Sequence, residues 1–462
     1  MKSQNKNAIF NILGPIILNG ISFFTMPFFT RMLGPEQYGI ASVYKTWVGI
    51  LSIIMGLQVQ GSIGAAVITF PEKSIKKFQS TVLLFGLFFS IGCFLVGCVL
   101  SDILVQYLLL PKNVLAVLGL HSMGVFVIGF AVLAFIFFKQ SKYSFAVNVS
   151  VAVIDALLSL YLIKWVFVAN QLYLGRIYGS AFPAIFAALI LIFYFLKMGQ
   201  FTFDLTYVKF CLPICLPLIF HGLSHIVLGQ SDRIMLQHMM GNADAGVYSF
   251  MIVFTSVLVA VWNALNNTWV PYYYDDLKNN QIAVIEQKTK NYIRMFSIIV
   301  IVFSLWATEV IKLFSPPSFW HSIRLLPVFA LSNYFTFLYS FPVNFQFFHK
   351  TTYSVATGTV LAALFNIGLN YLLIPKYGIM GAAIATLAAH VLLFVFHELI
   401  ADKLIKREYH YSLKTFLPGL IITMLAMVMG AVLEPYMVVR WGIGIVLSGY
   451  FIFDLYKRRS LF

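Results

Sequence analysis

The stretch RMLGPEQYGIAS at 31–42 has a counterpart in HMMGNADAGVYS at 238–249, and each stretch joins two long apolar runs. The two stretches share two glycines at a spacing of 207 residues, Gly34 with Gly241 and Gly39 with Gly246. Glycine lets the backbone turn tightly where a side chain would be strained. The chain is therefore predicted to contain two related halves, each with a tight turn after its first helix.

Other stretches repeat at nearly the same spacing. FFKQSKYS at 137–144 matches FFHKTTYS at 347–354 after 210 residues, and Gly175 matches Gly381 after 206. We therefore predict a first lobe of six helices at 1–200, a second at 205–402, and two additional helices at 410–458. Because six is even, both lobes enter the membrane in the same direction, as in transporters built from parallel repeats. Such lobes are predicted to enclose a central cleft.

The composition identifies the environment of these lobes. Of the 462 residues, 60% are hydrophobic and 10% are charged, and the mean hydropathy is +0.88. A soluble protein carries about 25% charged residues, so this chain lacks the groups to cover a water-facing surface. A soluble enzyme, a nucleic-acid-binding domain and a disordered chain are thereby excluded. The net charge of +15 is interpreted as loop charge beside anionic lipid.

Apolar blocks separated by charged residues, proline or glycine predict the membrane helices. At about 20 residues a span, the apolar content fills about fourteen spans. The predicted helices are 8–33, 38–68, 79–100, 114–138, 143–166, 172–196, 208–239, 245–271, 291–313, 323–348, 352–374, 378–401, 412–433 and 437–456. The predicted fold class is an all-α membrane protein with two pseudo-symmetric six-helix lobes and two C-terminal helices.

Lysine and arginine indicate the orientation. They gather in alternate connections, for example at Lys73, Lys76 and Lys77 and again at Lys403 and Lys406, and are sparse in the others. The side that carries more of them is generally cytoplasmic. Both termini of this multi-pass chain are therefore predicted to be cytoplasmic.

Three cations lie inside the predicted spans, near the glycine turns. By helical rise, Arg31, Lys45 and Arg233 are about 5, 9 and 12 Å from those turns. An ionisable side chain within a span is costly and suggests a function. Cations in a low-dielectric cleft suit an anionic group such as pyrophosphate. In the alternative, Arg31 reaches the interface and Arg233 pairs with Asp232 or Asp155.

Asp155 is a carboxylate in the middle of a predicted span. Two interpretations remain open. It binds a proton or sodium ion and couples transport to an ion gradient, or it neutralises a neighbouring cation. No bound cofactor is expected in either case.

A metal site is not predicted. Cys211, Cys215, His221 and His225 fall on one face of a helix, but they extend over about 21 Å. That is too far for ligands of one ion. These cysteines are expected to be buried as small apolar residues.

A second polar group consists of amides toward the predicted cytoplasmic side, namely Gln58, Gln60, Asn263, Asn266 and Asn267. Amides bind sugar hydroxyls without a fixed charge, so these residues are candidates for a sugar vestibule. The alternative is hydrogen bonding between helices, which is common for amides in membranes.

Three stretches carry a resemblance to a known family. They are PFFTRMLGPEQYGIASVYKTW at 27–47, GLQVQGSIGAAVITFPEK at 56–73 and SDRIMLQHMMGNADAGVYSF at 231–250. They resemble polysaccharide flippases of the multidrug/oligosaccharidyl-lipid/polysaccharide exporter superfamily, in particular the Wzx-type flippases of O-antigen and capsule repeat units. The resemblance covers essentially the whole chain.

The resemblance implies a function in a bacterial inner membrane. The expected substrate is an undecaprenyl-pyrophosphate-linked oligosaccharide, moved from the cytoplasmic to the periplasmic leaflet by alternating access. Polysaccharide polymerase and chain-length regulator are the expected protein partners. Arg31 falls in the family's Arg-x-Leu-Gly turn and Asp232-Arg233 in its Asp-Arg motif. We expect Asp232 and Asp155 to take part in ion coupling, whereas Lys45 and Asp155 rest on the physical argument alone.

Three alternative functions fit the sequence less well. A drug-cation antiporter of the same superfamily should offer carboxylates to its substrate, whereas the predicted cleft is richer in cations. A lipid II-type flippase also has fourteen spans, and in those proteins the extra helices form a lipid-lined groove. A membrane polymerase or ligase typically needs a large outer loop, and the predicted outer connections are all short. The chain is therefore predicted to be a flippase and not an enzyme.

Overall fold

The computed structural model describes residues 2–404, 411 and 413–458. Within these residues the chain is helical and contains no strand, as the hydropathy pattern predicts. The long helices are α1 Lys2–Gly56, α3 Glu72–Val99, α5 Leu115–Phe137, α6 Ser141–Trp165, α7 Leu172–Met198, α8 Leu205–Met240, α9 Asn242–Lys278, α10 Ile282–Phe314, α11 Leu326–Phe348, α12 Thr352–Tyr377, α13 Ile379–Leu404, α14 Leu413–Val432 and α15 Met437–Arg458. The short ones are η1 Val59–Ser62, α2 Ile63–Thr69, α4 Ser101–Leu108, η2 Lys112–Val114 and η3 Pro317–Leu325.

Twelve of the described helices are long and apolar enough to cross a membrane. One of them is the 44-residue stretch Leu13–Gly56, which bends at Gly34 (φ 64°, ψ 176°) and supplies two passes. α11 is not among the twelve, because polar residues such as Ser332 and Asn333 lower its hydropathy. It nevertheless packs between α10 and α13 like the other spans. When the two arms of α1 are counted separately and α11 is added, the twelve helices become fourteen spans, and each corresponds to one of the predicted helices.

The prediction of one helix over 38–68 is wrong at its far end. α1 stops at Gly56, and Leu57 and Gln58 have left-handed backbone conformations (φ 49° and 50°). The short helices η1 and α2 complete the segment. Glycine has a low helix propensity, which makes Gly56 a weak point that hydropathy alone does not reveal.

Two further differences come from charge. α3 and α10 begin at Glu72 and Ile282, well before their predicted starts, because their first turns carry lysines that an apolar pattern excludes. The structure also contains α4, a short helix between α3 and α5 that is absent from the prediction.

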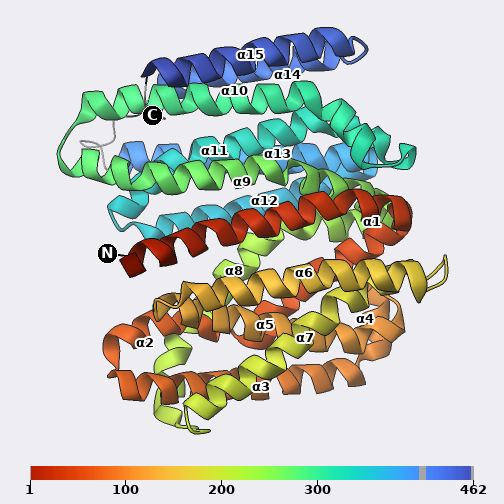
Figure 1. Ribbon diagram of the computed structural model, residues 1–462, viewed down its shortest axis with the longest axis vertical. Helices are drawn as coiled ribbons and strands as arrows, with labels where there is room; N and C mark the ends of the chain where they lie inside the picture. Colours follow the sequence, from red (N-terminus) through yellow and green to blue (C-terminus); the bar gives the residue numbers. More distant parts are fainter. Residues whose placement is uncertain (1, 405–410, 412, 459–462) are drawn as a thin grey trace. The chain divides into compact units, whose positions relative to one another are not determined.

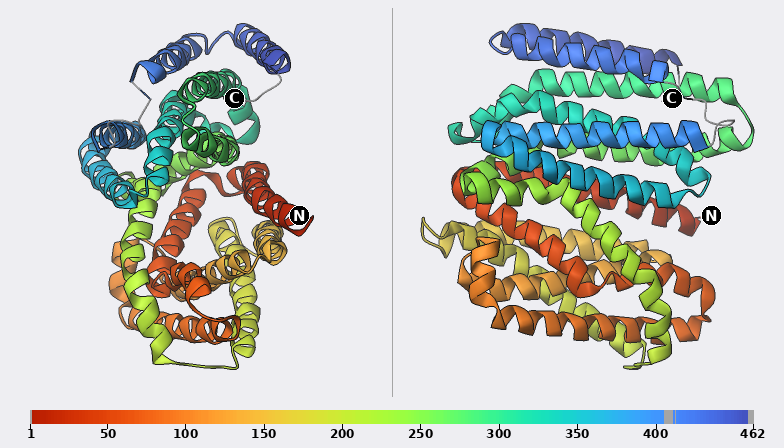
Figure 2. Two further views of the ribbon diagram at one scale, coloured as in Figure 1. Left: turned by 90° about the vertical axis from the view of Figure 1, so that its left-hand side faces the viewer. Right: turned by 180° about the vertical axis from the view of Figure 1, so that it is seen from behind.

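The described chain forms two compact units, Met1–Ser249 and Phe250–Phe462, and each is considered by itself. In the first unit α7 packs against α5 and α6, and α1 packs against α5, α6 and α8, as Figures 1 and 2 show. At the start of α8 the Thr206 backbone N–H donates to Asp204 Oδ1 (2.8 Å), which caps the helix and lowers the pKa of that carboxyl. The six-helix lobes stay a prediction from the repeat, because the two units divide inside α9.

The two glycine turns of the repeat lie against each other in the first unit. Gly34 and Gly241 both have positive φ (64° and 103°), which confirms the two predicted turns. A Cβ on Gly39 would stand 1.9 Å from the Asn242 carbonyl oxygen, and one on Gly246 would stand 2.1 Å from the Pro35 carbonyl oxygen. Only glycine therefore allows the second arm of α1 to approach the start of α9 this closely.

In the second unit, α14 and α15 run beside α10 (Figure 1). At one end the Arg440 guanidinium, only 1% exposed, binds both carboxylate oxygens of Glu309 (2.5 and 3.1 Å). It also donates to the Leu305 and Leu433 carbonyls (2.6 and 3.0 Å). At the other end Arg294 binds both oxygens of Asp454 (2.7 and 2.8 Å). Helix α15 is thus joined to α10 by an ion pair near each of its ends.

Candidate functional site

An ionic cluster joins three helices of the first unit. Lys45 Nζ, on the second arm of α1, lies 3.5 Å from Oδ2 of Asp155 on α6. Arg176 on α7 donates through Nη1 to Oδ1 of the same carboxylate. Ser159, one turn beyond Asp155, donates to Oδ1 (3.1 Å) and accepts from Arg176 Nη1 (2.8 Å). One carboxylate therefore bridges two cations that come from two other helices.

Close helix packing produces this geometry. A Cβ on Gly179 of α7 would stand 2.3 Å from Ser159 Oγ, so the missing side chain lets α7 lie directly on α6. Arg176, one turn earlier on α7, is thereby brought to Asp155. Its guanidinium carbon also lies 4.4 Å from the centre of the Phe29 ring, a favourable cation–π contact.

The two cations differ in how accessible they are. The Arg176 and Asp155 side chains are 15% and 18% exposed, whereas the Lys45 side chain is 46% exposed. Arg176 is held by the carboxylate, a hydroxyl and an aromatic ring, whereas Lys45 has one longer contact. Arg176 is therefore the fixed member of the cluster, and Lys45 is the member that a ligand can reach.

Arg233 on α8 adds a third cation beside this cluster. It lies close enough to Lys45 for the two charges to interact, and its other ionisable neighbours are Tyr38, Tyr248 and Asp232. The Nε of Arg233 is buried without a hydrogen-bond partner. A buried guanidinium N–H with no acceptor is costly, and an anionic ligand would supply the acceptor.

The carboxylates near Arg233 have other partners. Asp232 accepts a hydrogen bond from the Tyr248 hydroxyl (2.6 Å), and Asp155 is bound by Lys45 and Arg176. Among the described residues, Arg233 is not one of the charges that act on Asp155. Asp232 does act on Arg233, so pairing of Arg233 with Asp232 stays the alternative. Three cations and two carboxylates leave this part of the first unit with an excess of positive charge, which in a medium of low dielectric constant favours an anion.

Arg31 lies on the first arm of α1. Its side chain is exposed, and it is not among the electrostatic neighbours of Lys45 or Asp155 in the described part of the chain. Of the three predicted cations, the structure thus brings together Lys45 and Arg233.

The predicted amides fall in both units. Gln60 Nε2 donates to Gln58 Oε1 (2.6 Å) at the left-handed break after α1. In the second unit Asn266 accepts from Asn344 Nδ2 on α11 (2.9 Å), which is the hydrogen bond between helices considered as the alternative. Asn263 and Asn267 are exposed on α9. A sugar vestibule formed by these side chains stays a prediction.

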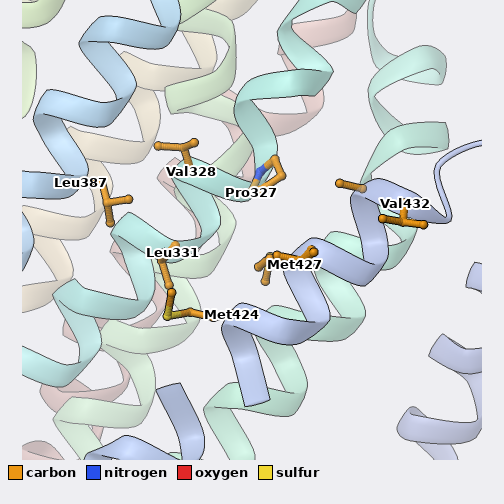
Figure 3. A pocket seen from close by; sticks show the side chains of 9 residues that line it. Pro327, Val328, Leu331, Leu387, Met424, Met427 and Val432 are labelled. Atoms are coloured by element: carbon orange, nitrogen blue, oxygen red, sulfur yellow. The ribbon is translucent and has the colours of Figure 1, made fainter. Parts of the chain in front are cut away.

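The second unit contains an apolar groove of about 510 Å³. It is formed by α11, α13 and α14, and Figure 3 shows Val328, Leu331, Leu387 and Met424 around it. A smaller pocket, which contains Ser304, Thr308 and Arg324, shares Pro327 and Met427 with it. The groove is thus apolar along its length and polar near one end.

Arg176 is the site residue that the sequence prediction misses. Arg176 lies only four residues inside α7, so hydropathy alone assigns it to the outer connection before that helix. The repeat contains the signal that could have found it, because at the 206-residue spacing Arg176 falls on Ala382. Lys45 and Arg233 are likewise cations present in only one half, because at the 207-residue spacing they fall on Ile252 and Met26.

The sequence matches a described family over more than half its length. Residues 5–275 match the family described as "Polysaccharide biosynthesis protein". A Haemophilus influenzae protein of the Lsg locus is 24% identical over 299 residues, which cover 60% of this chain and 68% of that protein. The sequence resemblance to polysaccharide flippases is thereby confirmed at the level of the family.

Solved structures share the fold. The lipid II flippase MurJ, in an inward closed conformation, has a TM-score of 0.64 at 14% identity and covers 98% of this chain and 99% of its own. An inward-facing multidrug resistance MATE transporter of the MOP superfamily has a TM-score of 0.66 at 13% identity, over 87% of this chain and all of its own. At such identities the likeness establishes the fold alone, which is that of membrane flippases and transporters.

Proposed function

Because the chain belongs to the polysaccharide biosynthesis protein family, we propose that it is a flippase for undecaprenyl-pyrophosphate-linked oligosaccharide repeat units. It carries them from the cytoplasmic to the periplasmic leaflet of a bacterial inner membrane. The sugar head crosses through the polar interior while the polyprenyl tail remains in lipid. Alternating access of the two lobes provides the movement.

The cation group of the first unit is the observation that carries this proposal. Lys45 is accessible, Arg233 has a buried Nε without an acceptor, and both lie beside the Asp155–Arg176 pair. Guanidinium and ammonium groups bind phosphate oxygens strongly, and most strongly where water is scarce. A pyrophosphate satisfies both side chains at once.

Asp155 supplies a route for ion coupling. Without substrate, its carboxylate neutralises Lys45 and Arg176. A pyrophosphate that draws Lys45 away leaves the carboxylate with less positive charge, and its affinity for a proton or sodium ion then rises. Substrate binding and ion binding are thereby linked through one side chain. Asp232, which is bonded to Tyr248 beside Arg233, is the second candidate for this role.

The groove of the second unit is the proposed contact for the polyprenyl tail. Its walls on α11, α13 and α14 are apolar along the length shown in Figure 3. Its methionines Met424 and Met427 are flexible side chains that adapt to a branched hydrocarbon.

Rescue of defined bacterial strains tests the proposal. A strain that lacks its repeat-unit flippase should regain the banding of lipopolysaccharide or capsule when it expresses this chain. Rescue of a strain that lacks its lipid II flippase would favour the lipid II alternative instead. Increased drug resistance without any rescue would favour the drug-cation antiporter, although a site rich in cations repels such substrates.

A further inference from the structure

A second apolar pocket lies in the first unit, apart from the ionic cluster. It has a volume of about 530 Å³ and is enclosed by the second arm of α1, α3, α4 and α5. Its walls include Trp47, Leu51, Phe94, Leu104 and Leu118. Pockets of this size hold small molecules in other proteins, and the mostly apolar walls favour a hydrocarbon occupant.

One end of this pocket lies between the candidate spans Glu72–Val99 and Lys112–Phe137, at the predicted surface of the membrane. Ser101 and Lys112 lie there, in the connection from α3 to α5. Helix α4 in this connection exposes Ile103 and Tyr107 (52% and 70%), which is typical of a helix at the membrane interface. The pocket therefore runs from the level of lipid head groups into the level of lipid chains.

Hydrocarbon alone does not select between lipids. The chains of the bilayer are as apolar as the side chains of the pocket, so transfer of a chain from one to the other has little driving force. Any preference must come from the head group at the mouth of the pocket.

The mouth carries a pair of opposite charges. Lys112 Nζ lies 2.5 Å from Asp102 Oδ1, and the two side chains are 64% and 84% exposed. A phosphoethanolamine head group also carries a negative and a positive charge side by side. Its phosphate matches Lys112 and its ammonium matches Asp102. A head group with only negative charge, such as phosphoglycerol or a pyrophosphate, would be repelled by Asp102.

We propose that this pocket binds phosphatidylethanolamine, with one acyl chain between α1, α3 and α5 and the zwitterionic head group on Lys112 and Asp102. The site is distinct from the proposed substrate path, because it uses none of the residues of the ionic cluster. Lipid binding at this pocket is measured by lipid retention and not by transport. A failure of this proposal is therefore distinguishable from a failure of the proposed function.

The experiment compares lipids that remain on the purified full chain. The protein is reconstituted in bilayers with equal amounts of phosphatidylethanolamine and phosphatidylglycerol, transferred to mild detergent, and analysed by mass spectrometry of the intact complex. Phosphatidylethanolamine should be retained at least threefold over phosphatidylglycerol. Undecaprenyl phosphate is added in a further arm as the purely anionic carrier lipid.

Two glycines of α3 provide a matched pair of variants. Gly97 lines the pocket and has room for a side chain, because the nearest atom to a Cβ there would be Leu104 Cδ1, at 3.8 Å. A Cβ on Gly92 would have nothing within 4 Å, and this glycine lies outside the pocket. Gly97→Leu fills the pocket and should lose the retained phosphatidylethanolamine, whereas Gly92→Leu should keep it.

Two exposed charges provide variants that do not endanger folding. Asp102→Asn should reduce the excess of phosphatidylethanolamine over phosphatidylglycerol, because it removes the group that matches the ammonium and repels the anionic lipid. Lys112→Gln should reduce the retention of both lipids, because both carry the phosphate. Equal retention of the two lipids by the unchanged protein would overturn the proposal. So would full retention by Gly97→Leu, or a loss of undecaprenyl phosphate in place of phosphatidylethanolamine in that variant.

Discussion

At the scale of single residues, Arg233 is the cation of the proposed substrate site that has a buried N–H without an acceptor. Its Nε is buried without an acceptor, and its charge adds to that of Lys45. Arg233→Ala should abolish surface polysaccharide in the rescue strain while the amount of protein in the membrane stays normal. Lys376→Ala is a control, because this lysine is exposed in the last turn of α12. Polysaccharide that persists in Arg233→Ala would contradict the role of this cation.

A second prediction at the scale of residues concerns the stability that the ion pair of Asp155 with Arg176 provides. Removing one partner of a buried ion pair costs about 3–5 kcal/mol, and the partial exposure of this pair reduces the expected loss to about 1–3 kcal/mol. Asp155→Asn should therefore lower the thermal stability, and the double variant Asp155→Asn/Arg176→Gln should recover part of it.

A transport assay distinguishes the role of Asp155 in ion coupling from its role in stability. Asp155→Asn should remove the dependence of flipping on a proton or sodium gradient in vesicles, and the double variant should not restore it. An unchanged response to both gradients in Asp155→Asn would exclude Asp155 from coupling.

The residues of the cluster also show what sequence alone can and cannot predict. Lys45, Asp155 and Arg233 are visible because a charge inside an apolar run is costly. Arg176 is not, because it lies near the end of its run, where hydropathy does not separate a helix from a loop. The partners of Asp155 depend on how closely α6 and α7 pack, and this closeness is set by tertiary contacts at Gly179.

At the scale of elements, the contact between the two glycine turns is the most demanding feature. A Cβ on Gly39 would stand 1.9 Å from the Asn242 carbonyl oxygen, so Gly39→Ala must separate the second arm of α1 from the start of α9. We expect a lower melting temperature and reduced transport. Gly20→Ala is the matched control in α1, because it has nothing within 4 Å and should gain up to about 1 kcal/mol of helix propensity. Equal melting temperatures for the two variants would contradict the close contact.

The two ion pairs that join α15 to α10 should differ in strength. Arg440 is almost fully buried and Arg294 is 44% exposed. Arg440→Met removes the cation beside Glu309, which keeps the hydrogen bond from Trp441 Nε1 (3.0 Å), and should cost about 3–5 kcal/mol. Arg294→Met should cost at most about 1 kcal/mol. Hydrogen exchange of α14 and α15 reports the difference. Equal protection in the two variants would show that Arg440 does not fix these helices.

The elements themselves are largely predictable from the sequence. Long apolar runs identify the helices, and the repeated glycines identify the two turns where φ is positive. The ends are less predictable, because lysines in the first turns of α3 and α10 hide helical residues and because α1 ends at Gly56 within an apolar run. Helix ends depend on backbone conformation and neighbouring contacts, which hydropathy does not record.

At the scale of the whole molecule, the distribution of charge predicts the orientation in the membrane. The net charge of +15 comes largely from connections on one side, such as the one with Lys73, Lys76 and Lys77. Positive connections are retained in the cytoplasm, so both termini should be cytoplasmic. A green fluorescent protein fused to the C-terminus should fluoresce, and alkaline phosphatase fused there should be inactive. Phosphatase inserted between Val168 and Gln171 should be active, because this connection lies on the opposite side. The reverse pattern would invert the direction of transport, since the cytoplasmic leaflet is where the proposed substrate is loaded.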